Sequence, residues 1–295
     1  MSTVIATQDL TKRFGSLTAV DSVSVSIDEN KIYGLLGRNG AGKTTIMHLL
    51  VGQDFPSSGS VTVFGESPVE NAAVLSNVSF IKESQRYPEN FTPRLVFEAA
   101  KSFHANWSSE LADQLIEEFR VPLKRGMKKL SRGQLSAVGV IVGLASRAPL
   151  TFFDEPYIGL DAVARQLFYD RLLEDYAEHP RTIVLSTHLI DEVSNLLEHV
   201  IVVDEGRVIL DTDAEELRGS AVTVVGRTAD VAAFVDGRDV IHRSSIGGLS
   251  SVSINGHLSV ADRAVAAASS LELTPVSLQQ LIVRLTSLET EGARS

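Results

Sequence analysis

A glycine-rich segment followed by a lysine and two threonines constrains this chain more than any other feature. A strand-like run, Lys31–Leu36, comes directly before it, and a helical pattern, Thr44–Gly52, begins within it. Glycines let successive backbone N–H groups face one anion, and the start of a helix adds the positive end of its dipole. The segment reads Gly37, Arg38, Asn39, Gly40, Ala41, Gly42, Lys43, Thr44 and Thr45, which matches the spacing of a phosphate-binding loop.

The side chains of this loop are expected to meet a nucleotide and its metal ion. Lys43 is expected to reach the β- and γ-phosphates, and the Thr44 hydroxyl to ligate Mg²⁺. The alternative is a glycine-rich turn with a surface lysine, but a strand before and a helix after are the context that a phosphate loop requires. The residues expected to hold the nucleotide are Gly37, Asn39, Gly40, Ala41, Gly42, Lys43, Thr44 and Thr45.

A second apolar run, Leu150–Phe153, ends in two acids. Asp154 is placed to hold Mg²⁺ directly or through water, and Glu155 is placed to take a proton from the attacking water as a general base. The alternative is that both acids only terminate a strand before the turn at Pro156. Beside a phosphate loop, we favour the catalytic interpretation.

Short β-branched runs alternate with helical patterns over the first two thirds of the chain, which is typical of an α/β domain with a largely parallel sheet. The strands are expected at Ser60–Phe64, Val78–Ile81, Leu150–Phe153, Thr182–Ser186 and Val200–Val203. The helices are expected at Thr44–Gly52, Ser109–Arg120, Ser131–Ser146, Ala162–Glu178 and Asp191–Glu198. The stretch 88–127 is mostly helical in pattern and predicts an inserted helical subdomain over about residues 88–148.

The pattern changes after Asp213, where short segments are separated by Asp-Gly, Gly-Gly and Asn-Gly turns and followed by a helical pattern, Val276–Leu285. We therefore expect a nucleotide-binding domain over residues 1–212 and a small α+β accessory domain over residues 213–295. The second domain carries no chemical motif, and packing or dimerisation is its expected role.

The composition excludes several classes of protein. The absence of cysteine removes disulfides, thiolate zinc sites and cysteine nucleophiles. The 27 Lys and Arg against 37 Asp and Glu give a net charge of −10, so no nucleic acid is expected as a partner. The N-terminus lacks a signal-peptide pattern, and the longest apolar stretch, Ala137–Ala145, is far short of the roughly twenty residues that span a bilayer. Any membrane pathway must therefore belong to another polypeptide.

A further segment, Leu130-Ser131-Arg132-Gly133-Gln134, resembles the LSGGQ signature of the ATP-binding cassette (ABC) family. Three more features agree with that family in order and spacing, over roughly residues 4–211. They are Phe14, placed like the aromatic that stacks on adenine, Ile158-Gly159-Leu160-Asp161, similar to the D-loop, and Ser186-Thr187-His188, similar to the segment with the switch histidine. The chain is most similar to the single-cassette subunits of bacterial ABC exporters.

The resemblance implies a P-loop NTPase core with an inserted helical subdomain, an ATPase activity, and ATP and Mg²⁺ as cofactors. In the family the signature of one subunit closes over the phosphate loop of another, so the resemblance implies a dimer with a second copy or a related chain. Ser131, Gly133, Gln134 and Asp161 would contact the nucleotide across that interface. His188 would sense the γ-phosphate and, with Lys43 and Glu155, would be catalytic.

Each of these assignments has a structural alternative. Ser131 and Gln134 have the spacing of a helix capping box, and Asp161 has that of an N-cap for Ala162–Glu178. Phe14 has the alternative of a core residue, and His188 that of a structural histidine.

Two positions depart from the family pattern. A glutamine that touches Mg²⁺ in the family aligns with Glu83, while the nearby glutamine is Gln85. Either oxygen could approach the metal, although an anionic Glu83 beside a triphosphate costs electrostatic energy. Arg132 replaces a signature glycine and is expected to place a cation near the γ-phosphate.

The resemblance implies an ATP-hydrolysing subunit that powers a separate transmembrane permease, as an exporter, at the cytoplasmic face of a bacterial membrane. The alternative is a soluble ABC-type ATPase that acts on nucleic acid, ribosomes or protein complexes without a permease. Such proteins commonly carry two cassettes or a long coiled coil, and this chain has neither. A small-molecule kinase would leave the signature segment without a role.

Overall fold

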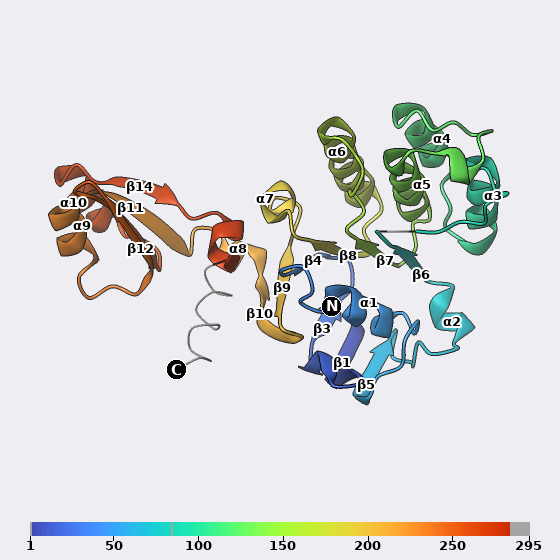
Figure 1. Cartoon of the computed structure of the whole chain (residues 1–295), viewed down its shortest axis with the longest axis horizontal. Helices are drawn as coiled ribbons and strands as arrows, with labels where there is room; N and C mark the ends of the chain where they lie inside the picture. The colour runs from blue at the N-terminus through green and yellow to red at the C-terminus, as the bar shows by residue number, and fades with distance from the viewer. Residues whose placement is uncertain (1, 84, 284–295) are drawn as a thin grey trace. The chain divides into compact units, whose positions relative to one another are not determined.

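The structure is a computed structural model that describes residues 2–83 and 85–283 (Figure 1). Its internal contacts form two compact units. The first holds the residues up to His188 together with Asn195–Asp211, and the second holds Leu189–Ser194 and the described residues from Thr212 onward. Every residue of the predicted site belongs to the first unit.

A six-stranded sheet forms the centre of the first unit. Its strand order is β10 (Arg207–Asp213), β9 (His199–Asp204), β4 (Ile32–Leu36), β8 (Thr182–Thr187), β7 (Leu150–Asp154) and β6 (Val78–Ile81). Strands β4, β6, β7, β8 and β9 pair in parallel, with Leu36 opposite Thr187 and Asp154 opposite Ser186. Their carboxyl ends therefore meet at one edge of the sheet, where ligands bind in open α/β folds.

A smaller antiparallel sheet packs on one side of the central sheet, together with α1 (Lys43–Leu50) (Figure 1). It consists of β1 (Thr3–Phe14), β2 (Leu17–Val23), β3 (Ser26–Asp28) and β5 (Ser58–Val63). Only β5 matches an expected strand. The register of β1 shifts against all three of its partners and Asp9 has a φ of 47°, so bulges interrupt the alternation of apolar and polar residues by which strands are recognised.

Helices lie on the other side of the central sheet (Figure 1). They are α3 (Pro93–Phe103), α4 (Ser109–Glu118), α5 (Arg132–Ala145) and α6 (Ala162–Glu178), with the single turn η1 (Met127–Lys129) before α5. The side chains of Thr92 and Ser108 cap α3 and α4 by accepting backbone N–H groups. The short helix α2 (Ala72–Leu75) precedes β6.

The helix expected at Asp191–Glu198 is much shorter in the structure, where α7 spans only Ile190–Val193. The Glu198 N–H donates to the carbonyl of Ile32, and its carboxylate accepts the Ile32 N–H at 2.9 Å. Glu198, which directly precedes β9, is therefore bonded to the start of β4, and this tertiary pairing overrides its helical pattern.

The second unit contains a βαββαβ arrangement. After α8 (Ala214–Leu217) come β11 (Ala221–Arg227), α9 (Thr228–Val235), β12 (Val240–Ile246), β13 (Leu249–Asn255), α10 (Val260–Ala268) and β14 (Glu272–Pro275). The sheet order is β12-β13-β11-β14 with every pair antiparallel, which is the ferredoxin-like topology. Of the helix expected at Val276–Leu285, residues 278–283 are helical, and 284 and 285 lie outside the described residues.

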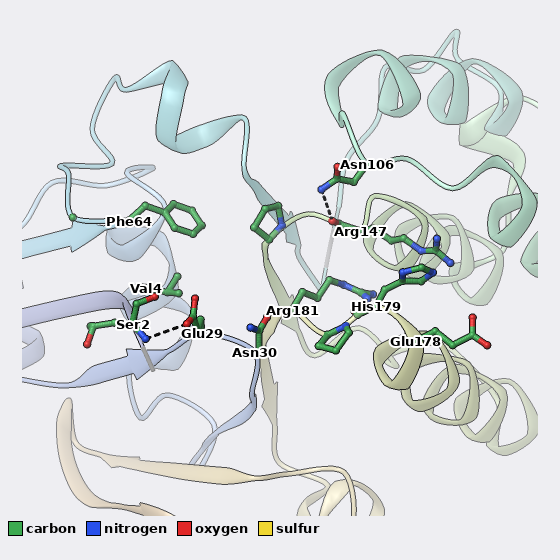
Figure 2. Close-up of a pocket in the computed structure, with 14 residues that line it drawn as sticks. Ser2, Val4, Glu29, Asn30, Phe64, Asn106, Arg147, Glu178, His179 and Arg181 are labelled. Carbon is green, nitrogen blue, oxygen red and sulfur yellow. Dashed lines mark hydrogen bonds between the residues drawn. The ribbon is translucent and has the colours of Figure 1, made fainter.

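A pocket of about 940 Å³ lies at the amino end of the central sheet (Figure 2). Among the residues that line it, Asn30 lies two residues before β4, and Pro149 and Arg181 directly precede β7 and β8. Arg147 donates two hydrogen bonds to Asp175 Oδ1, at 2.6 and 2.9 Å, and Arg181 Nη1 lies 2.8 Å from Asp175 Oδ2. The Asp175 carboxylate is buried, so this end of the sheet holds an internal ion cluster.

Candidate active site

The carboxyl end of the central sheet holds a second pocket, of about 830 Å³. It is built from the loops that follow β4, β6, β7, β8 and β9, joined by the region between β1 and β2. The sequence-predicted residues that line it are Phe14, Asn39, Gly40, Gly42, Lys43, Thr44, Thr45, Glu83, Asp154, Glu155 and His188. Two separate motifs, the phosphate loop and the acid pair, therefore meet at one edge because the strands that carry them are parallel.

The phosphate loop has the backbone that its glycines permit. Gly42 is the N-cap of α1 with a φ of 108°, and a Cβ at this position would lie 2.5 Å from the carbonyl oxygen of Ala19. Gly37 is similar, because its Cβ would lie 2.2 Å from the carbonyl oxygen of Val203. Neither Gly37 nor buried Ala41 is among the described residues that line the pocket, so any contact of theirs with a nucleotide stays a prediction.

Lys43 is buried at the base of the loop. Its Nζ donates to the carbonyls of Gly37, at 2.8 Å, and Arg38, at 3.1 Å, and lies 3.9 Å from Glu155 Oε1. Burial lowers the pKa of Lys43, and the carboxylates of Glu155 and Asp154 oppose this effect. An arriving phosphate offers this ammonium a charged acceptor in place of neutral carbonyls, which makes the stronger hydrogen bond.

Thr44 and Asp154 form a pair that suits a divalent cation. The Thr44 hydroxyl donates to Asp154 Oδ2 at 2.8 Å. Asp154 is buried, and its Oδ1 has no hydrogen-bond partner among the described residues. A buried carboxylate oxygen without a donor is costly unless a cation or a water meets it, and hard cations such as Mg²⁺ prefer oxygen ligands. The donor set therefore fits the metal site expected from the sequence.

Glu155 and His188 are in direct contact at the ends of β7 and β8. His188 Nδ1 lies 2.8 Å from Glu155 Oε2, and the Glu155 N–H donates to the Ser186 carbonyl. Glu155 is buried, whereas the His188 side chain is 39% exposed toward solvent. The expected general base and the expected phosphate sensor are thus neighbours within one chain.

Two residues were candidates for the metal-contacting glutamine position, Glu83 and Gln85. Both line one groove, but of the two only Glu83 is also among the described residues that line the phosphate pocket. Glu83 also pairs with Arg132 at 3.3 Å, so Arg132 contacts an acid of its own chain. The two departures from the family pattern therefore neutralise each other in the free subunit. Phe14 lines the same pocket, and its side chain is half exposed. The structure therefore disagrees with the alternative that Phe14 is a core residue.

Ser131, Gly133, Gln134 and Asp161 are absent from the described residues that line this pocket, although Arg132 of the same signature segment pairs with Glu83, which does line it. Ser131 Oγ accepts the Gln134 N–H and Gln134 Oε1 accepts the Ser131 N–H, so the capping box is formed, and Asp161 caps α6 through the Ala164 N–H. A hydroxyl that accepts one N–H still has its own O–H to donate, so capping leaves phosphate binding open to Ser131.

Tyr157 is a polar residue of the site that the sequence reasoning missed. It is buried between the acid pair and the D-loop segment, and its hydroxyl contacts Glu155, Thr187 and His188. The sequence indicated Tyr157 only by its place two residues after Glu155, in a turn that also holds Pro156. Which groups its hydroxyl contacts depends on the positions of β7 and β8, which the sequence does not give.

Sequence comparison finds relatives along most of the chain. A family profile described as ABC transporter matches residues 20–158, and one described as AAA domain, putative AbiEii toxin, Type IV TA system, matches residues 124–194. The bacitracin transport ATP-binding protein BcrA of Bacillus licheniformis is 32% identical over 222 residues, which are 74% of this chain and 72% of the relative. The chain belongs to the ABC transporter family.

Other relatives of this ABC ATPase agree. The Nod factor export ATP-binding protein I of Mesorhizobium japonicum is 32% identical over 215 residues, 70% of this chain and 63% of the relative. A solved ATP-binding subunit of an ABC transporter matches with a TM-score of 0.65 at 23% identity, covering 72% of this chain and 91% of that one. A dimeric ATP-binding cassette bound to ADP and phosphate matches with a TM-score of 0.62 at 20% identity, covering 71% and 98%. The predicted P-loop NTPase fold and the predicted identity as an ATP-binding, ATP-hydrolysing transporter subunit are confirmed.

Proposed function

We propose that this ABC ATPase binds ATP with Mg²⁺ at the carboxyl edge of its central sheet and hydrolyses it to drive a separate permease, as the ATP-binding subunit of an exporter. The observation that carries the proposal is the convergence of Lys43, Asp154, Glu155 and His188 on one pocket. The export assignment rests on the relatives whose names give bacitracin transport and Nod factor export.

Each group of the pocket has a proposed part in the reaction. Lys43 and the backbone N–H groups of the loop bind the β- and γ-phosphates, and Thr44 and Asp154, with Glu83 beside them, hold the metal. Bound Mg²⁺ supplies charge neutralisation at the phosphate oxygens. Glu155 takes a proton from the attacking water, and His188 hydrogen-bonds the γ-phosphate or that water. Within the described part of the chain no three acids or histidines form a metal cluster, so phosphate oxygens and water would complete the coordination.

A second ATP-binding subunit is part of this proposal. Ser131 and Arg132 are exposed at the start of α5, and neither is among the described residues that line the pocket of their own chain. We propose that Ser131, Gly133, Gln134 and Asp161 complete the pocket of the partner subunit, so that each ATP lies between two chains. The structural neighbour that is a dimer bound to ADP and phosphate supports this arrangement.

The permease is a separate chain in this proposal. No helix in residues 2–83 and 85–283 combines the length and the apolar character that a membrane crossing requires. We propose that the subunit docks at the cytoplasmic face of a bacterial membrane. After affinity purification from detergent-solubilised membranes, co-purification of a multi-helix membrane protein that stimulates ATP turnover is the expected result. Ribosomes or nucleic acid in its place would favour the soluble ATPase.

The catalytic assignment is tested with Glu155→Gln. We expect turnover to fall by about 10²- to 10⁴-fold with ATP binding retained, because the amide keeps the shape of the side chain but cannot take the proton. The matched control is Glu98→Gln, which changes an exposed acid of α3 that is not among the described residues lining the pocket, and it is expected to keep turnover near wild type. Brisk hydrolysis by Glu155→Gln, measured as phosphate release, would contradict the assignment.

A further inference from the structure

The Tyr157 hydroxyl lies at the centre of a buried hydrogen-bond cluster. Tyr157 is 3% exposed, and its hydroxyl donates to Glu155 Oε2. The same oxygen lies 2.8 Å from Thr187 Oγ1, 3.2 Å from His188 Nδ1, and 3.3 Å from the His188 backbone nitrogen. One hydroxyl therefore joins the ends of β7 and β8, which supply the expected base and the expected phosphate sensor.

The positions of the protons follow from the donors and acceptors. A phenol has one proton, and here it goes to Glu155, so the Tyr157 oxygen accepts from the Thr187 hydroxyl and the His188 N–H. A carboxylate can only accept, so His188 Nδ1, at 2.8 Å from Glu155 Oε2, must carry its ring proton. Burial, followed by the contact with Glu155, raises the pKa of Tyr157, which keeps its hydroxyl in the donating form.

Glu155 needs such support because its backbone is unusual. It has a φ of 49°, in the left-handed region that residues with a Cβ rarely adopt and that persists only when the surroundings enforce it. With Tyr157 and His188 both bound to Oε2, the other oxygen, Oε1, is left on the side of Lys43, whose Nζ lies 3.9 Å away.

We propose that Tyr157 is a positioning residue that holds Glu155 and His188 in one arrangement, with the His188 proton on Nδ1, so that Glu155 Oε1 and His188 Nε2 are presented to the bound nucleotide. Neither the phosphate loop nor the signature segment includes this residue. The proposal rests on the proposed function for its effect on turnover, but the state of the His188 ring can be measured without nucleotide.

The test is Tyr157→Phe, which keeps the aromatic ring and removes only the hydroxyl. We expect kcat to fall roughly 10- to 100-fold, because a hydrogen bond to a charged group is lost and the base is no longer oriented. The KM for ATP should stay within about twofold, since Tyr157 does not line the pocket among the described residues. In ¹⁵N spectra of the nucleotide-free protein, the His188 signals, assigned by their loss in His188→Gln, should change from the Nδ1–H form to a mixture of ring tautomers.

The matched control is Tyr169→Phe, the same change at another buried tyrosine in the first unit, on α6. It should match wild type in kcat and in the His188 spectrum. Thr187→Val is a second probe, because it removes a donor to the Tyr157 oxygen but keeps the tyrosine; a loss of kcat in the same direction, several-fold, is expected. This variant also tests the proposal if Tyr157→Phe fails to fold.

Two results would overturn the proposal. One is a Tyr157→Phe variant with wild-type kcat. The other is a variant that loses kcat and melting temperature together while the His188 spectrum stays unchanged, which would mean that Tyr157 only packs. Absence of ATP hydrolysis by the wild-type chain would instead refute the proposed function, and the nucleotide-free spectra would still decide the role of Tyr157.

Discussion

The two ends of the central sheet both carry charged side chains, and they use them differently. At the amino end, two guanidinium groups, from Arg147 and Arg181, are placed on the single buried carboxylate of Asp175. At the carboxyl end, the Lys43 ammonium donates hydrogen bonds to two neutral backbone carbonyls. The buried Oδ1 atom of Asp154 accepts no hydrogen bond from the described residues. At the amino end the buried acid is met by cations of the same chain, whereas the carboxyl end holds charges that a phosphate and a cation can satisfy.

This difference indicates that polar burial alone does not identify a site. The pocket at the amino end is the larger of the two, about 940 Å³ against about 830 Å³. The carboxyl end differs because the loops after five parallel strands bring a lysine and carboxylates into one pocket. Some of their donor and acceptor atoms can still bind a phosphate or a cation. Substitutions at the amino end should therefore change stability, and substitutions at the carboxyl end should change ligand binding or turnover.

The largest effect on folding is expected from Asp175→Asn. Removing this charge leaves the buried guanidinium of Arg181 and the partly exposed one of Arg147 without this counterion, and loss of one partner of a buried ion pair costs about 3–5 kcal/mol. Denaturant titration should show that loss, while turnover per folded molecule stays near wild type. The control is Asp170→Asn, an exposed acid of the same helix that accepts from Gln166, with an expected change within about 0.5 kcal/mol. If the denaturation midpoint of Asp175→Asn equals that of wild type, the amino end does not stabilise the fold in the way that this comparison requires.

A smaller effect, on binding only, is expected from Phe14→Ala at the carboxyl end. If adenine stacks on this ring, ATP binding weakens by about 1–3 kcal/mol. Stability should change little because the side chain is half exposed. Phe55→Ala is the control, since Phe55 is more exposed and is not among the described residues that line the pocket. Equal affinities of both variants by calorimetry would assign Phe14 to packing.

The smallest of the three free-energy changes is expected at Ser131, which is not among the described residues that line either pocket. Ser131→Ala removes the N-cap of α5 and should cost about 0.5–2 kcal/mol. Ser131→Asn should restore the cap, because asparagine is an equally good N-cap residue. If the hydroxyl also contacts the partner's nucleotide, turnover at dimer-forming concentrations should fall in both variants. If Ser131→Asn restores turnover together with the cap, the role of Ser131 is limited to capping α5.

The contiguous motifs were readable in advance because each is encoded by neighbouring residues. The loop at 37–45 needs only its glycines and the elements on either side, and β7 and α6 begin where their patterns predict. The same holds for the caps at Ser131 and Asp161, whose partners lie three residues away. The structure also places Glu83, and not Gln85, at the pocket, which the alignment of that segment left open.

Other features depend on partners far away in the chain. Strand β1 was missed because bulges disturb its alternation of apolar and polar residues. Glu198, expected in a helix, instead bonds to Ile32, which is distant in sequence. The βαββαβ topology of the second unit depends on which strands pair, and short Val- and Ser-rich segments leave that choice open.

Residue order in this chain was sufficient to identify a nucleotide-binding ATPase of the cassette type, since local backbone chemistry makes a phosphate loop wherever such a segment follows a strand. The cluster around Tyr157 and the ion cluster at Asp175 became visible only in three dimensions. Both join side chains from different strands and helices, and their distances follow from strand register and helix packing, which no short stretch of sequence encodes.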